Sequence, residues 1–123
     1  HYGVPEAPRG PFRDGEGGML EIPASTIRRF GRNWPAAGGG FFRLYPLRAS
    51  LWAIGQVNTA DRLPAVFYFH PWELDPEQPR VEGVTRRTRF RHYLNLSRFE
   101  SRLKTLLSRF SWGRMDKVFG VDR

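Results

Sequence analysis

The sequence contains no cysteine, which excludes disulfide bonds and thiolate metal sites. Lysine is nearly absent: Lys104 and Lys117 are the only lysines among the 20 lysine and arginine residues. No stretch reaches the roughly 18 consecutive apolar residues of a membrane-spanning helix, and no signal-peptide pattern is present. These absences predict a chain without a membrane span and leave its redox compartment open.

The composition is that of a folded chain with a strongly basic balance. Of the 123 residues, 40% are apolar and 15% aromatic, enough for a packed core. The formal net charge of +8 would suit nucleic acid, anionic lipid or an acidic polymer. A GC-rich gene gives the same arginine content without any function, and we favour that explanation. Because no helix or strand signal precedes Gly17, we expect residues 1–123 to be a fragment of a longer domain.

The hydrophobic pattern predicts strands and helices in alternation. The expected strands lie at 18–23, 25–30, 64–70 and 110–112. The expected helices lie at 44–58, 97–109 and 114–119. Between them we expect loops at 31–44 and 71–79 and a basic connection at 80–93. The order of these elements predicts an α/β fold with parallel strands.

Local signals refine two of these segments. Ser97 and Glu100 have the spacing of a capping box at the start of the last long helix, followed by an apolar stripe on one face. The Gly-Gly-Gly run at 38–40 lets the backbone turn sharply or approach another group closely. It is not a phosphate-binding loop, because neither a following Lys-Ser/Thr nor a GxGxxG spacing is present.

The most informative stretch is FYFHPWELDPEQPR at 67–80. Pro71 disfavours the helical conformation for the residue before it, so His70 is expected to be extended. His70 would then end a buried strand, where catalytic side chains gather in parallel α/β folds. Glu73 and Asp75 follow closely enough to orient or tune it. Taken alone, however, the stretch favours a structural histidine, and no serine or cysteine lies in a nucleophile-elbow context.

Other candidate sites are weaker. The three histidines show no metal-binding spacing, so a metal site formed within the chain is not expected. Phe90, His92 and Tyr93 interleave with arginines in a way that could bind nucleic acid, but a solvated connection is favoured and no nucleic-acid-binding motif is present.

Aromatic residues in glycine- and proline-rich segments are candidates for binding sugars. Trp34, Phe41, Phe42 and Trp72 would either form a stacking platform or close the core. Glu21 alternates with apolar neighbours and therefore points to the opposite face of its strand, toward solvent or a barrel interior.

Several stretches together resemble the C-terminal part of NodB-type polysaccharide deacetylases, in the branch associated with exopolysaccharide and exosortase (PEP-CTERM) gene clusters. The matching stretches are YGVPEAPR (2–9), GGMLEIPASTIR (17–28), GRNWPAAGGGFFRLYP (31–46), AVFYFHPWELDPEQPR (65–80), FRHYLNL (90–96) and FSWGRMDKVF (110–119). They cover nearly the whole chain in order.

The resemblance implies a fold and a chemistry. The fold would be the C-terminal portion of an irregular (β/α) barrel, and the parent would hydrolyse N-acetyl groups of an exopolysaccharide in a bacterial cell-envelope pathway. His70 would be the general acid that protonates the departing amine. Phe41, Arg43, Trp72 and Glu21 would be substrate contacts, matched only by their position at strand or loop ends.

The resemblance also implies what this stretch lacks. A divalent metal, usually zinc, would serve the parent enzyme, but the Asp-Asp, His-x-x-x-His and arginine-proline motifs of the family do not occur here. Its partners would be the N-acetylated polysaccharide and the missing N-terminal half of the domain, and the isolated chain would be inactive. Two other hypotheses remain open: a small basic module that binds nucleic acid or an acidic glycan, and a non-catalytic accessory domain.

Overall fold

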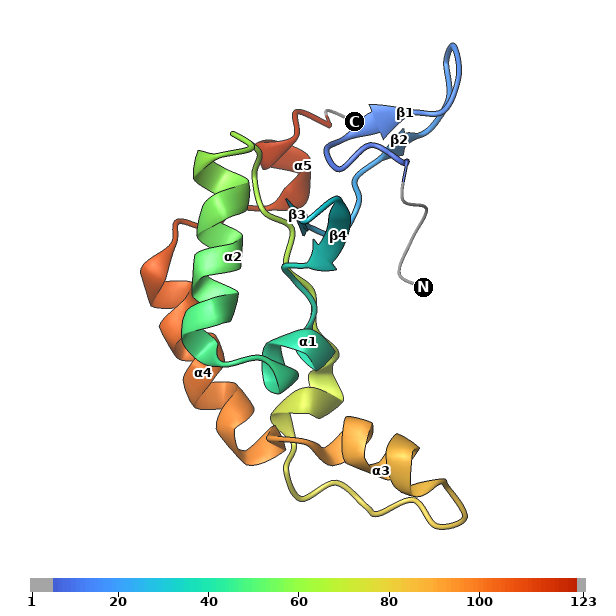
Figure 1. The fold of residues 1–123 in the computed structure, drawn as a ribbon, viewed down its shortest axis with the longest axis vertical. Coiled ribbons are helices and arrows are strands. Elements are labelled where there is room, and N and C mark those ends of the chain that lie inside the picture. Colours follow the sequence, from blue (N-terminus) through green and yellow to red (C-terminus); the bar gives the residue numbers. More distant parts are fainter. Residues whose placement is uncertain (1–5, 122–123) are drawn as a thin grey trace.

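The computed structural model describes residues 6–121 and shows a mixed α/β chain with two small antiparallel sheets. Each sheet is one hairpin: β1 (Phe12–Arg13) pairs with β2 (Leu20–Glu21), and β3 (Thr26–Arg29) pairs with β4 (Arg32–Pro35). The helices are α1 (Gly39–Leu44), α2 (Leu47–Thr59), α3 (Arg86–Tyr93), α4 (Leu96–Arg109) and α5 (Met115–Val118), with a 3-10 helix at Pro71–Leu74. The molecule is elongated, with the β1–β2 hairpin and α3 at opposite ends (Figure 1).

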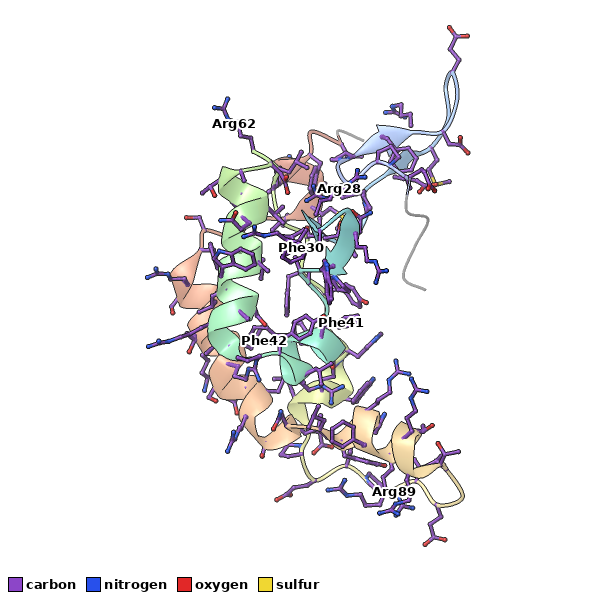
Figure 2. The ribbon with its side chains drawn as sticks, in the orientation of Figure 1. Arg28, Phe30, Phe41, Phe42, Arg62 and Arg89 are labelled. Carbon is purple, nitrogen blue, oxygen red and sulfur yellow. The ribbon has the colours of Figure 1, made fainter. Side chains whose placement is uncertain are left out.

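The core forms where α2 and α4 run side by side (Figure 1). Ile54 of α2 packs with Phe99, Leu103 and Leu106 of α4. Phe42 of α1, labelled in Figure 2, joins them. The predicted apolar stripe of the last long helix is therefore confirmed, because its spacing of three and four residues places one face against α2. The helix expected at 44–58 is confirmed as α2, and the turn expected at 114–119 as α5.

The segment expected as the strand 64–70 is extended but has no strand partner among the described residues. Its backbone bonds other groups: the Val66 N–H donates to Ser25 Oγ (2.7 Å), and the Tyr68 carbonyl accepts from the Gly39 N–H (2.9 Å). The ring of Phe67 packs edge-on against the core ring of Phe42. Because each hairpin pairs within itself, the expected parallel pairing does not form in this part of the chain. The mixed α/β class is confirmed, and the barrel stays a prediction.

Four local predictions were wrong. The expected loop 31–44 contains β4 and α1, the expected basic connection 80–93 contains α3, and 110–112 is not a strand. The capping box does not form, because α4 begins at Leu96 after the left-handed Asn95, and Glu100 instead pairs with Lys104 at 2.7 Å.

No helix in the described part of the chain is both long enough and apolar enough to cross a membrane.

Candidate functional site

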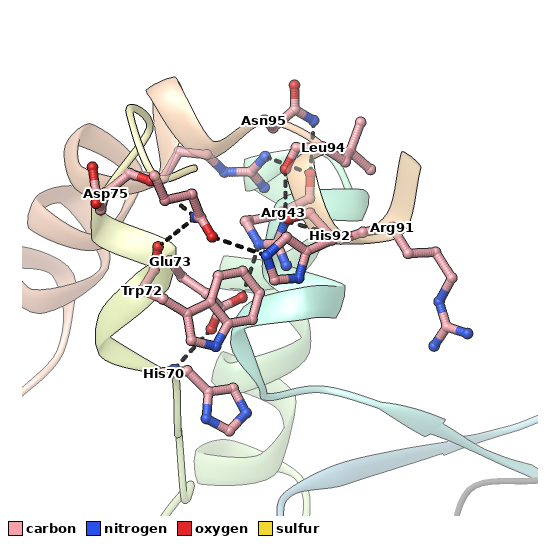
Figure 3. A network of polar contacts seen from close by, with 11 residues as sticks. Arg43, His70, Trp72, Glu73, Asp75, Arg91, His92, Leu94 and Asn95 are labelled. Carbon is pink, nitrogen blue, oxygen red and sulfur yellow. Dashed lines mark hydrogen bonds and ion pairs between the residues drawn. The ribbon is translucent and has the colours of Figure 1, made fainter. Parts of the chain in front are cut away.

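A buried ion pair joins α1 to the 3-10 helix that follows His70. Arg43 is 2% exposed and Glu73 is 1% exposed, and Arg43 Nε lies 2.8 Å from Glu73 Oε1. Arg43 Nη1 also donates to the carbonyl oxygens of His92 and Leu94 at the end of α3, both at 2.9 Å. Because one guanidinium bonds both segments, it holds the 3-10 helix and α3 against α1 (Figure 3).

The second oxygen of the same carboxylate fixes the backbone of His70. The His70 N–H donates to Glu73 Oε2 at 2.9 Å, and the backbone at His70 is extended (φ −97°, ψ 142°), as the proline after it predicts. Sequence spacing suggested that Glu73 or Asp75 would orient the imidazole. Instead, Glu73 holds the backbone of His70, and Asp75 accepts from a backbone N–H two residues later. The exposed imidazole of His70 thus projects from a firmly held backbone.

The glycine run makes this arrangement possible. Gly38 has a φ of 104°, which favours glycine, and a Cβ on Gly39 would lie 2.0 Å from Glu73 Oε2. The Gly39 N–H also donates to the carbonyl oxygen of Tyr68. The expected close approach of the glycine backbone is therefore confirmed, and the group that it approaches is the buried carboxylate of Glu73.

Two alanine substitutions in this run should have different effects on stability. Gly39→Ala should lower the free energy of unfolding by about 1–3 kcal/mol, because the added methyl group displaces the carboxylate of Glu73. Gly40→Ala meets nothing within 4 Å and should leave stability unchanged or raise it by about 0.5–1 kcal/mol. Urea denaturation of both variants measures the difference. Equal effects would contradict the close packing at Gly39.

Aromatic rings stack beside the ion pair. The Trp72 ring is nearly parallel to those of His70 and His92, with centroid distances of 5.9 Å and 4.2 Å. The Arg43 guanidinium carbon lies 5.2 Å from the centroid of Trp72. The imidazole of His92 also has a hydrogen-bond partner, because its Nε2 lies 2.9 Å from Gln78 Oε1. Trp72 thus links the two imidazoles and presents an aromatic surface next to the exposed one (Figure 3).

These side chains line a cleft of about 410 Å³ between α1, the 3-10 helix and α3. The structure brings together four of the five residues predicted from the sequence: Phe41, Arg43, His70 and Trp72 line this cleft. The fifth, Glu21, is exposed on β2, does not line the cleft and belongs to the hairpin at the other end of the molecule (Figure 1). The guanidinium of Arg43 already bonds Glu73 and the carbonyls of α3. It therefore shapes the cleft wall, whereas the imidazole of His70 remains open to a ligand.

Sequence reasoning did not assign Tyr68 or His92 to this cleft, although both line it. Tyr68 lies two residues before His70, so the two side chains fall on the same side of an extended segment. This alternation of side chains could have assigned Tyr68 to the cleft. His92 comes from α3, which was not predicted as a helix, so no local signal linked it to Trp72.

The described residues do not fit a metal ion. Residues 6–121 contain no group of three or more histidine, cysteine, aspartate or glutamate side chains that could hold one. The carboxylate nearest to His70, that of Glu73, is buried and bonded by Arg43. If a metal ion acts at this cleft, its ligands would therefore have to come from outside residues 6–121.

Fold and site together define a class of protein: a small, arginine-rich α/β chain with an open imidazole in an aromatic cleft. The chain belongs to the family described as a domain of unknown function (DUF3473), whose model matches residues 1–120. No curated protein and no solved structure matches it significantly. The family match spans the cleft and both hairpins.

Proposed function

We propose that this chain is the C-terminal part of a NodB-type polysaccharide deacetylase and that His70 is the general acid of the reaction. The support comes from the ordered resemblance along the sequence and from the cleft that surrounds His70. In this proposal, His70 donates a proton to the amine nitrogen as the bond between nitrogen and the acetyl carbon breaks. The substrate is an N-acetylated exopolysaccharide of a bacterial cell-envelope pathway.

The observation that carries the proposal is the combination of a fixed backbone and an open ring at His70. A general acid must come within hydrogen-bond reach of the leaving group in a defined orientation. The carboxylate of Glu73 holds the backbone of His70, while the exposed imidazole faces the cleft. Phe41 supplies an aromatic surface on which the C–H face of a sugar ring can pack, and Trp72, whose ring stacks with His92, forms the cleft wall beside it.

The proposal gives this chain only half of the chemistry. A divalent metal in the parent enzyme would polarise the acetyl carbonyl and activate water. Since the described residues do not fit a metal ion, its ligands and the base would belong to the N-terminal half that the resemblance implies. This chain would supply the proton donor and one wall of the sugar site.

The test is acetate release by the full-length protein that carries this chain. With a polymer of N-acetylglucosamine as substrate, we expect acetate to be released and a chelator to stop the release. No release from this polymer or from the N-acetylated polymers of the source organism would refute the proposal. A salt-sensitive shift of DNA mobility would instead support the basic binding module.

A further inference from the structure

A second hollow lies between the β3–β4 hairpin and the start of α2. It has a volume of about 470 Å³ and is lined by Ile27, Arg29, Phe30, Trp34, Pro35, Tyr45, Pro46, Ala49, Trp52 and Ala53. We call it the aromatic groove. Three of its rings are well exposed: Phe30 at 94%, Trp34 at 46% and Trp52 at 44%. Such an arrangement offers flat apolar faces to a ligand.

The backbone at Phe30 is unfavourable for the residue that it carries. Phe30 and Gly31 form the two-residue loop of the hairpin, between the paired Arg29 and Arg32. Both loop residues have positive φ, 52° and 70°, and asparagine-glycine is the preferred pair for such a turn. A phenylalanine here is strained and solvent-exposed, and it adds nothing to the core. Strain of this kind gathers at functional positions, so the ring is best explained by a ligand.

The charged groups that border the groove are arginines. The Arg29 guanidinium carbon lies 5.1 Å from the centroid of the Trp52 ring, and none of the described residues that line the groove carries a carboxylate. Arg32 is exposed and pairs with Arg29 across the hairpin, and Arg48 lies one turn before Trp52 on α2. The groove therefore favours a ligand that combines a flat apolar face with a negative charge.

The aromatic groove adjoins the cleft of His70. Phe41 lines the cleft, Tyr45 lines the groove, and their ring centroids are 5.8 Å apart. The Tyr45 hydroxyl is protonated at neutral pH, as any tyrosine is, and can donate a hydrogen bond; burial raises the pKa of this phenol further. Two neighbouring hollows joined by aromatic rings suit a polymer whose successive units occupy both.

We propose that the aromatic groove binds a uronic-acid unit of the same polysaccharide whose N-acetylated unit lies at His70. The inference rests on the proposed function for its choice of a glycan. A pyranose ring would pack its C–H face on the exposed ring of Phe30, and its carboxylate would pair with Arg29, which lies over the Trp52 ring, since a guanidinium matches a carboxylate in shape and charge. The substrate is accordingly an acidic heteropolysaccharide.

The test is a calorimetric titration of the full-length protein with an oligoglucuronate hexamer, with a chitin hexamer as the neutral comparison. We expect the acidic hexamer to bind the more tightly and its affinity to fall with added salt. Phe30→Asn should weaken acidic binding by at least about tenfold through the loss of a stacked ring. The same variant should keep or raise the melting temperature, because asparagine suits the turn. Leu107→Asn makes a comparable change at a half-exposed position of α4 that does not line the groove, and it should leave the affinity for the acidic hexamer unchanged.

The outcomes separate this inference from the deacetylase proposal. If the wild-type protein binds oligoglucuronate but releases no acetate from any N-acetylated polymer, the deacetylase is refuted and the groove is kept. Acetate release without oligoglucuronate binding would refute the groove alone. Wild-type affinity in Phe30→Asn, equal affinity for the chitin hexamer, or tighter binding of a single-stranded oligonucleotide would each overturn the groove as a uronate site.

Discussion

Replacing His70 by alanine should lower kcat/KM for acetate release by the full-length protein by about 10²–10⁴-fold, the usual contribution of a general acid. The variant should keep its metal content and its fold. The imidazole is exposed, and the hydrogen bond to Glu73 comes from the backbone N–H, which alanine retains. Acetate release, metal analysis and a thermal melt of the same preparation measure the three quantities. Loss of metal in His70→Ala would refute the role as an acid.

His92 provides the matched control, because it is the other described imidazole in the same cleft. Its Nε2 already bonds Gln78 and its ring stacks closely on Trp72. His92→Asn should therefore lower acetate release less than about tenfold, through packing of the cleft wall alone. A loss as large as that of His70→Ala would show that the stacked rings matter as a unit and would contradict a specific proton donor at His70.

The two long helices that were predicted correctly, α2 and α4, each have a buried face. The stripe of α4 could be read from the sequence because Phe99, Leu103 and Leu106 all enter one core. Helix α3 was missed because it buries none of its residues. The Thr85 side chain caps its start, and Arg43 bonds carbonyl groups at its end. Neither contact has a signature in hydrophobic periodicity, and the second joins residues 49 positions apart in the chain.

Only the part of the candidate site that has a local signal in the sequence could be predicted. His70 could be singled out locally, because the proline after it fixes an extended backbone at the end of an apolar run. The partner of Glu73 could not, since Arg43 lies 30 positions away along the chain. Glu21 alternates with apolar neighbours as a site residue would, but its hairpin lies at the far end of the molecule from α3 (Figure 1). Alternation identifies a face of a strand and not the place of that strand in the fold.

The Arg43–Glu73 pair should be the most sensitive point of the described structure. Arg43→Leu should lower the free energy of unfolding by about 3–5 kcal/mol, because it leaves the carboxylate of Glu73 buried without its partner. For a domain whose total stability is on the order of 5–15 kcal/mol, this is a large fraction. Arg114→Leu makes the same change in an exposed pair with Asp116 and should cost less than about 1 kcal/mol. Urea denaturation of both variants compares the two pairs.

The double variant Arg43→Leu/Glu73→Leu separates two roles of the ion pair: its effect on stability and its positioning of His70. Removing both charges eliminates the buried carboxylate, so the double variant should be more stable than Arg43→Leu alone. It should nevertheless lose acetate release, because no carboxylate then holds the His70 backbone N–H and no guanidinium holds the end of α3. Stability that recovers while activity does not would assign the pair to positioning His70. An equal recovery of both would mean that the pair serves the fold alone.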